Sequence, residues 1–130
     1  MATQPHPSGP SRVLLIDDNV DLTSMLSLCL QADGVDVIVA ADGEAGLALM
    51  EDQPVDVVVT DLFMPDKDGI ETIVELKKRY PDVKIVVMSG FTSIGGTDYL
   101  GVARELGAVT TLKKPFDPAE LSKVVRELTA

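Results

Sequence analysis

The chain has 130 residues, of which 45% are hydrophobic, and its formal net charge is -10. This length suits one domain with a single core, and the acidic balance disfavours direct binding of nucleic acid, whose phosphates attract basic surfaces. No apolar run approaches the roughly 20 residues of a membrane span, and the single cysteine excludes an internal disulfide, so we expect a cytoplasmic protein. Residues 1–11, rich in proline, serine and glycine, are expected to form a disordered tail before a folded domain at 12–130.

The first third of the chain predicts two strands with a helix between them. Residues 12–16 form an apolar strand, and a helix then runs to about Ala32. Gly34 can close that helix in a left-handed conformation, before a strand at 35–40. Apolar residues at helical spacing mark the expected inner face of the helix: Leu22, Met25, Leu26 and Cys29.

The middle third predicts a buried strand between two helices. Asp42 can cap the second helix, and Pro54 ends it. The β-branched run at 55–60 is typical of a strand that is covered on both faces. Asp68 can cap the third helix. The inner faces of these helices are expected to carry Ala45, Ala48 and Leu49, and Ile70, Ile73 and Val74, respectively.

The last third repeats the alternation of strand and helix. A fourth strand is predicted at 84–88, and a loop that contains Gly95-Gly96 leads to a fourth helix that includes Tyr99. A short fifth strand is predicted at 109–112. Asp117 can cap the last helix, because a proline and a glutamate follow it at the spacing of a helix start. The apolar stripe of that helix is expected to be Leu121, Val124, Val125 and Leu128.

Five repeats of strand and helix define the predicted fold class. Short links between alternating strands and helices imply parallel strands with helices on both faces. Five units are too few for an eight-fold barrel. The sequence therefore predicts an α/β protein with a doubly wound, five-stranded parallel sheet and five helices.

Polar side chains follow four of these strands. Asp17 and Asp18 come after the first strand, Asp61 after the third, Ser89 after the fourth and Lys114 after the fifth. In an open parallel sheet the carboxyl ends of the strands meet at one edge, where ligands bind. Three carboxylates there would repel one another unless a hard divalent cation lay among them. The set is suited to a phosphoryl group held by such a cation.

In order and position, these residues resemble the receiver domain of two-component response regulators. The resemblance covers about residues 12–128. The matching motifs are Asp17-Asp18, Asp61-x-x-Met64-Pro65-x-x-Asp68-Gly69, Ser89-Gly90 and Lys114-Pro115-Phe116. The resemblance implies a flavodoxin-like sheet with strand order 2-1-3-4-5.

The resemblance also implies a role for each site residue. Asp61 would accept a phosphoryl group, Lys114 would pair with a phosphoryl oxygen, and Ser89 would donate its hydroxyl to that group. The loop that starts at Gly90 would then move, and the Lys114-Pro115 bond would be cis. The implied Mg²⁺ ligands are Asp17, Asp18, Asp61 and the backbone carbonyl of Phe63.

The expected function is a phosphorylation-activated switch, and not an enzyme beyond its own phosphorylation and dephosphorylation. The phosphoryl group would come from a histidine kinase or a histidine phosphotransfer protein. The signal would pass to a downstream effector by protein contact, without direct contact with nucleic acid or membrane. Three alternatives stay open: a stand-alone regulator, a receiver cut from a longer response regulator or hybrid kinase, and a dimer that forms on phosphorylation.

Two departures bear on competing interpretations. Thr111 stands where the family often carries an aromatic residue that swings inward on activation, so the output is expected to run through the loop from Ser89 to Tyr99. Phe63 stands where an aspartyl-phosphate phosphatase would need a second acid, which disfavours that enzyme class. A flavin carrier on the same fold is also disfavoured, because Asp17 and Asp18 would repel its phosphate.

Overall fold

The computed structural model describes residues 11–62, 69–90, 93–94 and 97–130. Strands and helices alternate along the chain as predicted, except for one added pair of short strands. In chain order the elements are β1 (Arg12–Ile16), α1 (Val20–Ala32), β2 (Asp36–Ala40), α2 (Gly43–Asp52), β3 (Val57–Asp61), α3 (Gly69–Arg79), β4 (Lys84–Ser89), β5 (Ser93–Ile94), β6 (Thr97–Asp98), α4 (Tyr99–Glu105), β7 (Thr110–Lys113) and α5 (Pro118–Thr129).

Within the described residues, five parallel strands form the main sheet, in the order β2-β1-β3-β4-β7. Because β5 and β6 pair only with each other, β7 is the fifth strand of this sheet, and the predicted order 2-1-3-4-5 is confirmed. The order of strand addition reverses at β1, between its neighbours β2 and β3. The carboxyl ends of the strands at such a switch point are where open α/β sheets bind their ligands.

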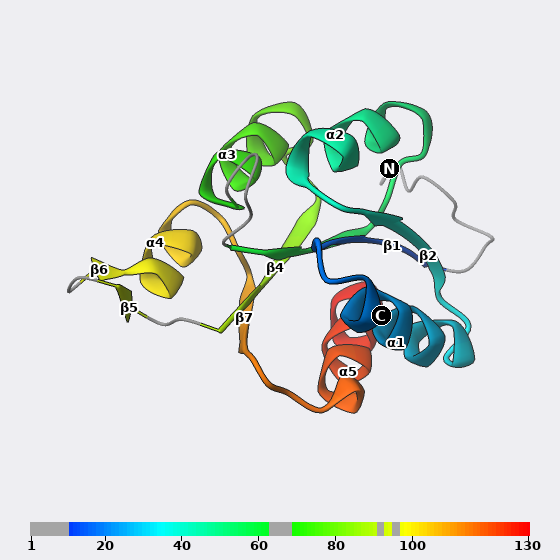
Figure 1. Ribbon diagram of the computed structural model, residues 1–130. Coiled ribbons are helices and arrows are strands. Elements are labelled where there is room, and N and C mark those ends of the chain that lie inside the picture. Colours follow the sequence, from blue (N-terminus) through cyan, green and yellow to red (C-terminus); the bar gives the residue numbers. More distant parts are fainter. Residues whose placement is uncertain (1–10, 63–68, 91–92, 95–96) are drawn as a thin grey trace.

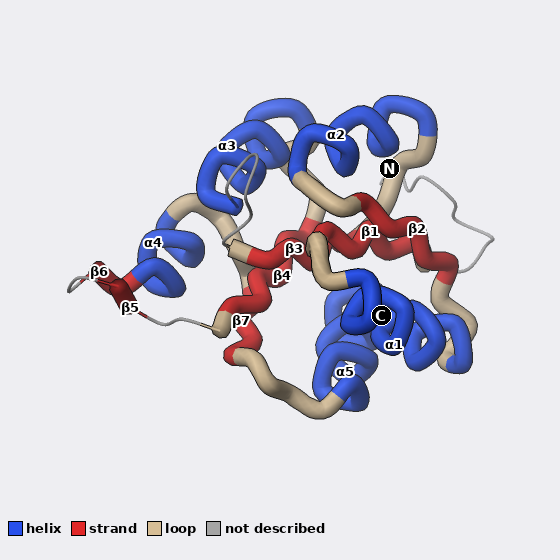
Figure 2. The backbone as a smooth tube through the Cα atoms, in the orientation of Figure 1, coloured by secondary structure: helices blue, strands red, loops and turns tan. Residues whose placement is uncertain are grey.

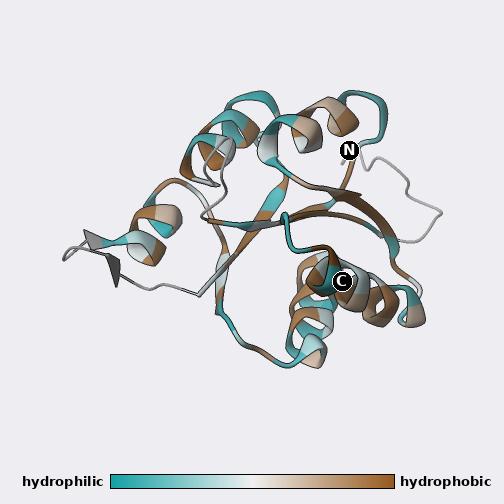
Figure 3. Cartoon of the chain, in the orientation of Figure 1, coloured by the Kyte–Doolittle hydropathy of each residue, from teal (hydrophilic) through white to brown (hydrophobic). Residues whose placement is uncertain are grey.

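Two helical layers cover the sheet (Figure 1), which lies between them as a twisted band (Figure 2). Helices α1 and α5 lie on one face, and α2, α3 and α4 lie on the other. The strands are mainly hydrophobic (brown), while hydrophilic residues (teal) lie on the outward sides of the helices (Figure 3). The buried strand residues that face α1 and α5 are Val13, Leu15, Val57, Val59, Val86, Met88 and Leu112. Those that face α2, α3 and α4 are Leu14, Ile16, Ala40, Val58, Ile85 and Val87.

Local polar contacts set the helix ends. The side chain of Asp42 accepts a hydrogen bond from Ala45 N at the start of α2, and that of Asp117 caps α5, so both predicted caps are confirmed. Gly34 has a φ of 83°, the left-handed conformation expected after α1. Asn19 caps α1, and the predicted cap Asp68 lies outside the described residues.

The predicted helix faces were partly wrong. Met25 and Val74 are both 47% exposed, although their spacing placed them on inner faces. In α2 the exposed residues include Ala45 and Ala48, because glycines make the close contact instead. A Cβ atom at Gly46 would lie 2.6 Å from a methyl carbon of Ile16, so a larger residue there would have to displace that side chain. The buried residues of α2 are Gly43, Gly46, Leu47 and Met50.

Two further differences concern strands. The third strand begins at Val57 rather than at residue 55, and it includes Asp61. The antiparallel pair β5 and β6 was not predicted, although a Gly-Gly dipeptide between two short segments is a known hairpin signal. Of the predicted tail, Ser11 lies within the described residues, and its carbonyl accepts a hydrogen bond from Asp36 N. None of the described helices combines the length and apolar character needed to cross a membrane.

Candidate functional site

Asp17 is the buried anchor of the site. It follows β1 directly, and its backbone N donates to Ala40 O at the end of β2, 3.1 Å away. Its side chain is 1% exposed, with Oδ1 accepting a hydrogen bond from Asn19 N at 2.9 Å. A carboxylate this buried requires compensation for lost hydration, so its neighbours must supply donors and positive charge.

Asp61 ends the central strand β3, where it pairs in register with Met88 of β4. Its side chain is 13% exposed and therefore reachable from solvent. Just beyond the strand, Leu62 O accepts a hydrogen bond from Gly69 N at 2.7 Å. The start of α3 thus lies against the backbone at the end of β3.

Asp17, Asp18 and Asp61 form an acidic cluster at the carboxyl ends of β1 and β3. One carboxylate oxygen from each residue lies within 4.8 Å of the others. Asp17 is buried, whereas Asp18 is exposed, so the cluster opens to solvent on one side. Oxygen donors of this kind match the ligands that hard divalent cations prefer, so these residues could hold a metal ion.

Lys114 supplies positive charge to the cluster from the far edge of the sheet. Its Nζ lies 2.7 Å from Asp17 Oδ2 and 3.5 Å from Asp61 Oδ2. The following peptide bond, Lys114-Pro115, is cis, as expected from the resemblance. One ammonium facing three carboxylates leaves the site with an excess of negative charge, which favours a further cation.

Ser89 is fully buried at the end of β4, one strand away from Asp61. Its carbonyl accepts a hydrogen bond from Lys114 N at 2.8 Å, so the backbones that carry the hydroxyl and the ammonium are directly joined. Gly90 follows at the surface, and a Cβ atom there would meet no atom within 4 Å. The structure thus places five of the predicted side chains at the ends of four neighbouring strands, while Phe63 lies outside the described residues.

Sequence reasoning missed the partner of Thr111. Arg104, in the last turn of α4, donates from Nη2 to Thr111 Oγ1 at 2.8 Å. In place of an aromatic ring, this chain therefore has a hydrogen bond between α4 and β7. No periodicity or motif marks the pair, because its members are seven residues apart on different elements.

Any side chain at Gly69 is predicted to destabilise the fold. A Cβ atom there would lie 2.5 Å from Asp61 O and 2.6 Å from Leu62 Cα, which are backbone atoms at the end of β3 and just beyond it. Gly69→Ala should lower the free energy of unfolding by about 1–3 kcal/mol, as overpacking does. Gly90→Ala is the matched control, with an expected change below about 0.5 kcal/mol. Urea unfolding measures both, and equal effects would contradict the close-approach argument.

Comparison with known proteins identifies the family. Residues 13–126 match the response regulator receiver domain. This match spans most of the sequence, so the chain belongs to the receiver domain family. Membership implies a histidine kinase as partner in general, and the cluster of Asp17, Asp18 and Asp61 is consistent with signalling by aspartate phosphorylation.

Relatives of known name extend the comparison. The chain is 38% identical over 118 residues to the transcriptional regulatory protein CpxR of Klebsiella pneumoniae, covering 91% of this chain and 49% of the relative. It is 36% identical over 117 residues to the probable transcriptional regulator ycf27 of Porphyridium aerugineum, covering 90% of this chain and 47% of the relative. The chain thus spans about half the length of these relatives.

Solved structures agree with the fold. The Vibrio cholerae chemotaxis protein CheY4 superimposes with a TM-score of 0.84 at 30% identity, covering 92% of this chain and 99% of that one. A receiver domain protein from Methanospirillum hungatei gives a TM-score of 0.83 at 26% identity, covering 93% of this chain and 95% of that one. The chain is therefore similar in structure to CheY-like receivers.

Proposed function

We propose that the chain is a signalling switch that is activated when Asp61 accepts a phosphoryl group in a Mg²⁺-dependent reaction. The observation that carries this proposal is the position of Lys114 Nζ, 2.7 Å from Asp17 Oδ2 and 3.5 Å from Asp61 Oδ2, beside the acidic cluster. A weakly nucleophilic carboxylate can accept a phosphoryl group when the charge around it is neutralised. An ammonium on one side and a cation-binding cluster on the other meet that requirement.

The donor set fits Mg²⁺. Asp17, Asp18 and Asp61 would provide carboxylate oxygens, and the carbonyl of Phe63 is proposed as a further ligand. When bound, the ion would neutralise part of the negative charge of the carboxylates and of the phosphoryl group.

Transfer from a phosphohistidine would proceed as a displacement at phosphorus. An oxygen of Asp61 forms a bond to phosphorus while the bond from phosphorus to the imidazole nitrogen breaks, and that nitrogen keeps the electron pair. Lys114 pairs with an oxygen of the transferred group. Ser89 donates its hydroxyl to the same group, and Gly90 follows Ser89 at the start of the next loop. The movement of that loop would convert the local bond into a signal.

The proposed donor is a histidine kinase or a histidine phosphotransfer protein, and the proposed output is contact with an effector protein. Because the relatives with known names are transcriptional regulators about twice as long, a receiver acting within a longer response regulator is the second candidate. In either case the proposed transfer of a phosphoryl group to Asp61 is the same.

Phosphorylation by a small donor tests the proposal. With acetyl phosphate and Mg²⁺, the chain should gain the mass of one phosphoryl group, and peptide mapping should place it on Asp61. Chelating Mg²⁺ should prevent the gain. Steady release of phosphate from unrelated organic phosphate esters would instead indicate a phosphatase, and absence of any labelled chain would overturn the proposal.

A further inference from the structure

A fully buried hydroxyl stands directly before the proposed acceptor, Asp61. Thr60 is 0% exposed, as are the three valines that precede it in β3. Valine has nearly the shape of threonine and would continue the apolar run. A hydroxyl at such a position costs free energy unless it makes a hydrogen bond. The Thr60 hydroxyl therefore needs a partner within the fold.

That partner is the backbone of Asp61. Thr60 Oγ1 donates a hydrogen bond to Asp61 O at 2.9 Å. The other polar atom of the same peptide group, Leu62 N, donates to Met88 O of β4 at 3.1 Å. The peptide group between Asp61 and Leu62 is thus held at its oxygen by a side chain and at its nitrogen by the neighbouring strand.

This hydrogen bond acts where the sheet ends. The register between β3 and β1 ends at Thr60, and the register between β3 and β4 ends at Asp61. A rotation of the peptide group that follows Asp61 would change the direction of the Asp61 side chain relative to the strand. The two hydrogen bonds on that group oppose such a rotation, so the hydroxyl of Thr60 helps to set the direction of the carboxylate.

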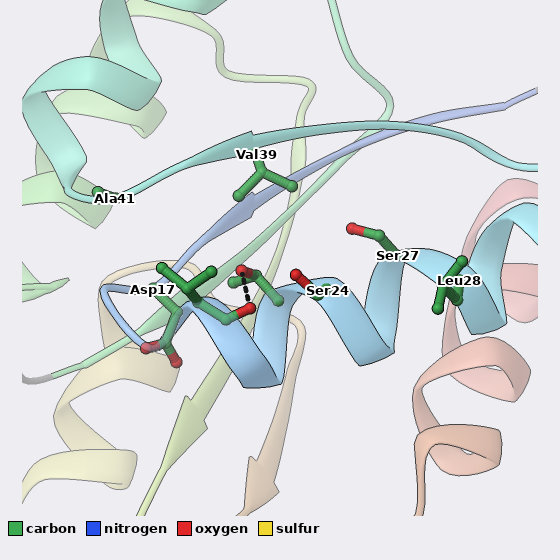
Figure 4. Close-up of a pocket in the computed structure, with 8 residues that line it drawn as sticks. Asp17, Ser24, Ser27, Leu28, Val39 and Ala41 are labelled. Atoms are coloured by element: carbon green, nitrogen blue, oxygen red, sulfur yellow. Dashed lines mark hydrogen bonds between the residues drawn. The ribbon is translucent and has the colours of Figure 1, made fainter.

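The carboxylate of Asp61 has to meet groups that are themselves fixed. Asp17 is buried, and its Oδ2 lies 2.7 Å from Lys114 Nζ. The Asp17 carboxylate points away from Val39 of the edge strand (Figure 4), and one of its oxygens lies within 4.8 Å of an oxygen of Asp61. A small displacement of Asp61 would change its distances to both Asp17 and Lys114. Misplacement of a reacting group by about 1 Å can slow a reaction about 100-fold.

We propose that Thr60 is a positioning residue of the phosphorylation site, whose hydroxyl holds the peptide group after Asp61 and so directs the acceptor carboxylate toward phosphorus. The inference rests on the proposed function, because it concerns transfer to Asp61. Thr60 acts through Asp61 and needs no contact with the phosphoryl group. A hydroxyl with a purely structural role would change the stability of the fold but not the rate of transfer to the folded chain, so the two roles can be separated.

Variants that separate the hydroxyl of Thr60 from its methyl group test the proposal. Thr60→Val replaces the hydroxyl, whereas Thr60→Ser keeps it and loses the methyl group. With acetyl phosphate and saturating Mg²⁺, labelling of Thr60→Val should be about tenfold slower than that of the native chain, and labelling of Thr60→Ser less than about twofold slower. Thr60→Ser should still unfold at a lower urea concentration than the native chain, because a buried methyl group is lost.

A second pair keeps the test decisive if Thr60→Val does not fold. Thr60→Ala and Thr60→Ser differ only in the hydroxyl, so the alanine variant should be labelled about tenfold more slowly than the serine variant. Circular dichroism establishes that each variant is folded at the temperature of the labelling reaction.

Thr23→Val is the matched control. Thr23 is 3% exposed, and its hydroxyl donates to Val20 O at 3.2 Å, the hydrogen bond drawn as a dashed line in Figure 4. The substitution therefore removes the same kind of hydrogen bond from α1, at a carbonyl outside the acidic cluster. Labelling of this variant should match that of the native chain.

Three results would overturn the positioning role alone: a native rate for folded Thr60→Val, equal rates for Thr60→Ser and Thr60→Ala, or an equal loss of rate in Thr23→Val. The proposed function would stand in each case, because the native chain would still be labelled on Asp61. Absence of labelling in the native chain would overturn the proposed function and this inference with it.

Discussion

Asp61→Asn is expected to abolish phosphorylation of the chain at every Mg²⁺ concentration. The amide is nearly the same size as the carboxylate but is not a nucleophile toward phosphorus, so the acyl phosphate cannot form. Because the change also removes one negative charge from a cluster of three carboxylates, the fold should tolerate it. Mass spectrometry after treatment with acetyl phosphate measures the result.

Asp18→Asn is the matched control, since it also removes one negative charge from the acidic cluster. This variant keeps the proposed acceptor, Asp61, and loses one proposed ligand of the ion. It should still be labelled, but with a Mg²⁺ requirement raised by about tenfold or more, comparable to the losses seen when metal sites are altered. If Asp61→Asn were labelled as fast as the native chain, another residue would be the acceptor.

Lys114→Met is expected to lower the free energy of unfolding by about 3 kcal/mol in buffer without divalent ions. The ammonium is 2.7 Å from the carboxylate of Asp17, whose side chain is 1% exposed. Removing one partner of a buried ion pair leaves the other charged and poorly hydrated, and such changes cost about 3–5 kcal/mol. The value at the lower end applies here because the lysine is 23% exposed. Urea unfolding with a chelator present measures the loss.

Two observations accompany this prediction. Arg126→Met is the control. The side chain of Arg126 is 60% exposed and lies 3.0 Å from Asp33, and surface pairs of this kind contribute less than about 1 kcal/mol to stability. Mg²⁺ should also stabilise Lys114→Met more than it stabilises the native chain, because the ion replaces part of the missing positive charge. Equal losses in the two variants, with no effect of Mg²⁺, would show that Lys114 does not compensate the acidic cluster.

The sheet was predictable because its strands are buried on both faces. Residues 57–60 of β3 are each 0% exposed. Strands buried in this way consist of continuous apolar or β-branched residues, which are easy to recognise in a sequence. The helix caps Asp42 and Asp117 were predictable for a related reason, since capping depends on residues a few positions apart. Local rules therefore determined the order of elements and most of their ends.

Features that depend on close packing were not predictable. The inner face of α2 is built on glycines, which periodicity of large apolar residues cannot detect. In the site, the sequence placed charged residues at strand ends but could not give the contact between Lys114 and Asp17, which are 97 residues apart. The bond from Arg104 to Thr111 likewise depends on how α4 packs beside β7. Side-chain distances follow from the tertiary fold and leave no mark on the local sequence.

The position of β3 has a consequence for how the molecule would behave in deuterated water. This strand lies between β1 and β4, whereas β7, which precedes Lys114, is an edge strand. Amide protons of β3 can exchange only when the sheet as a whole opens, while those of an edge strand can exchange through local fraying. Asp61, the proposed acceptor, is thus attached to an interior strand whose amides should exchange slowly, and Lys114 follows an edge strand that can loosen without unfolding the rest.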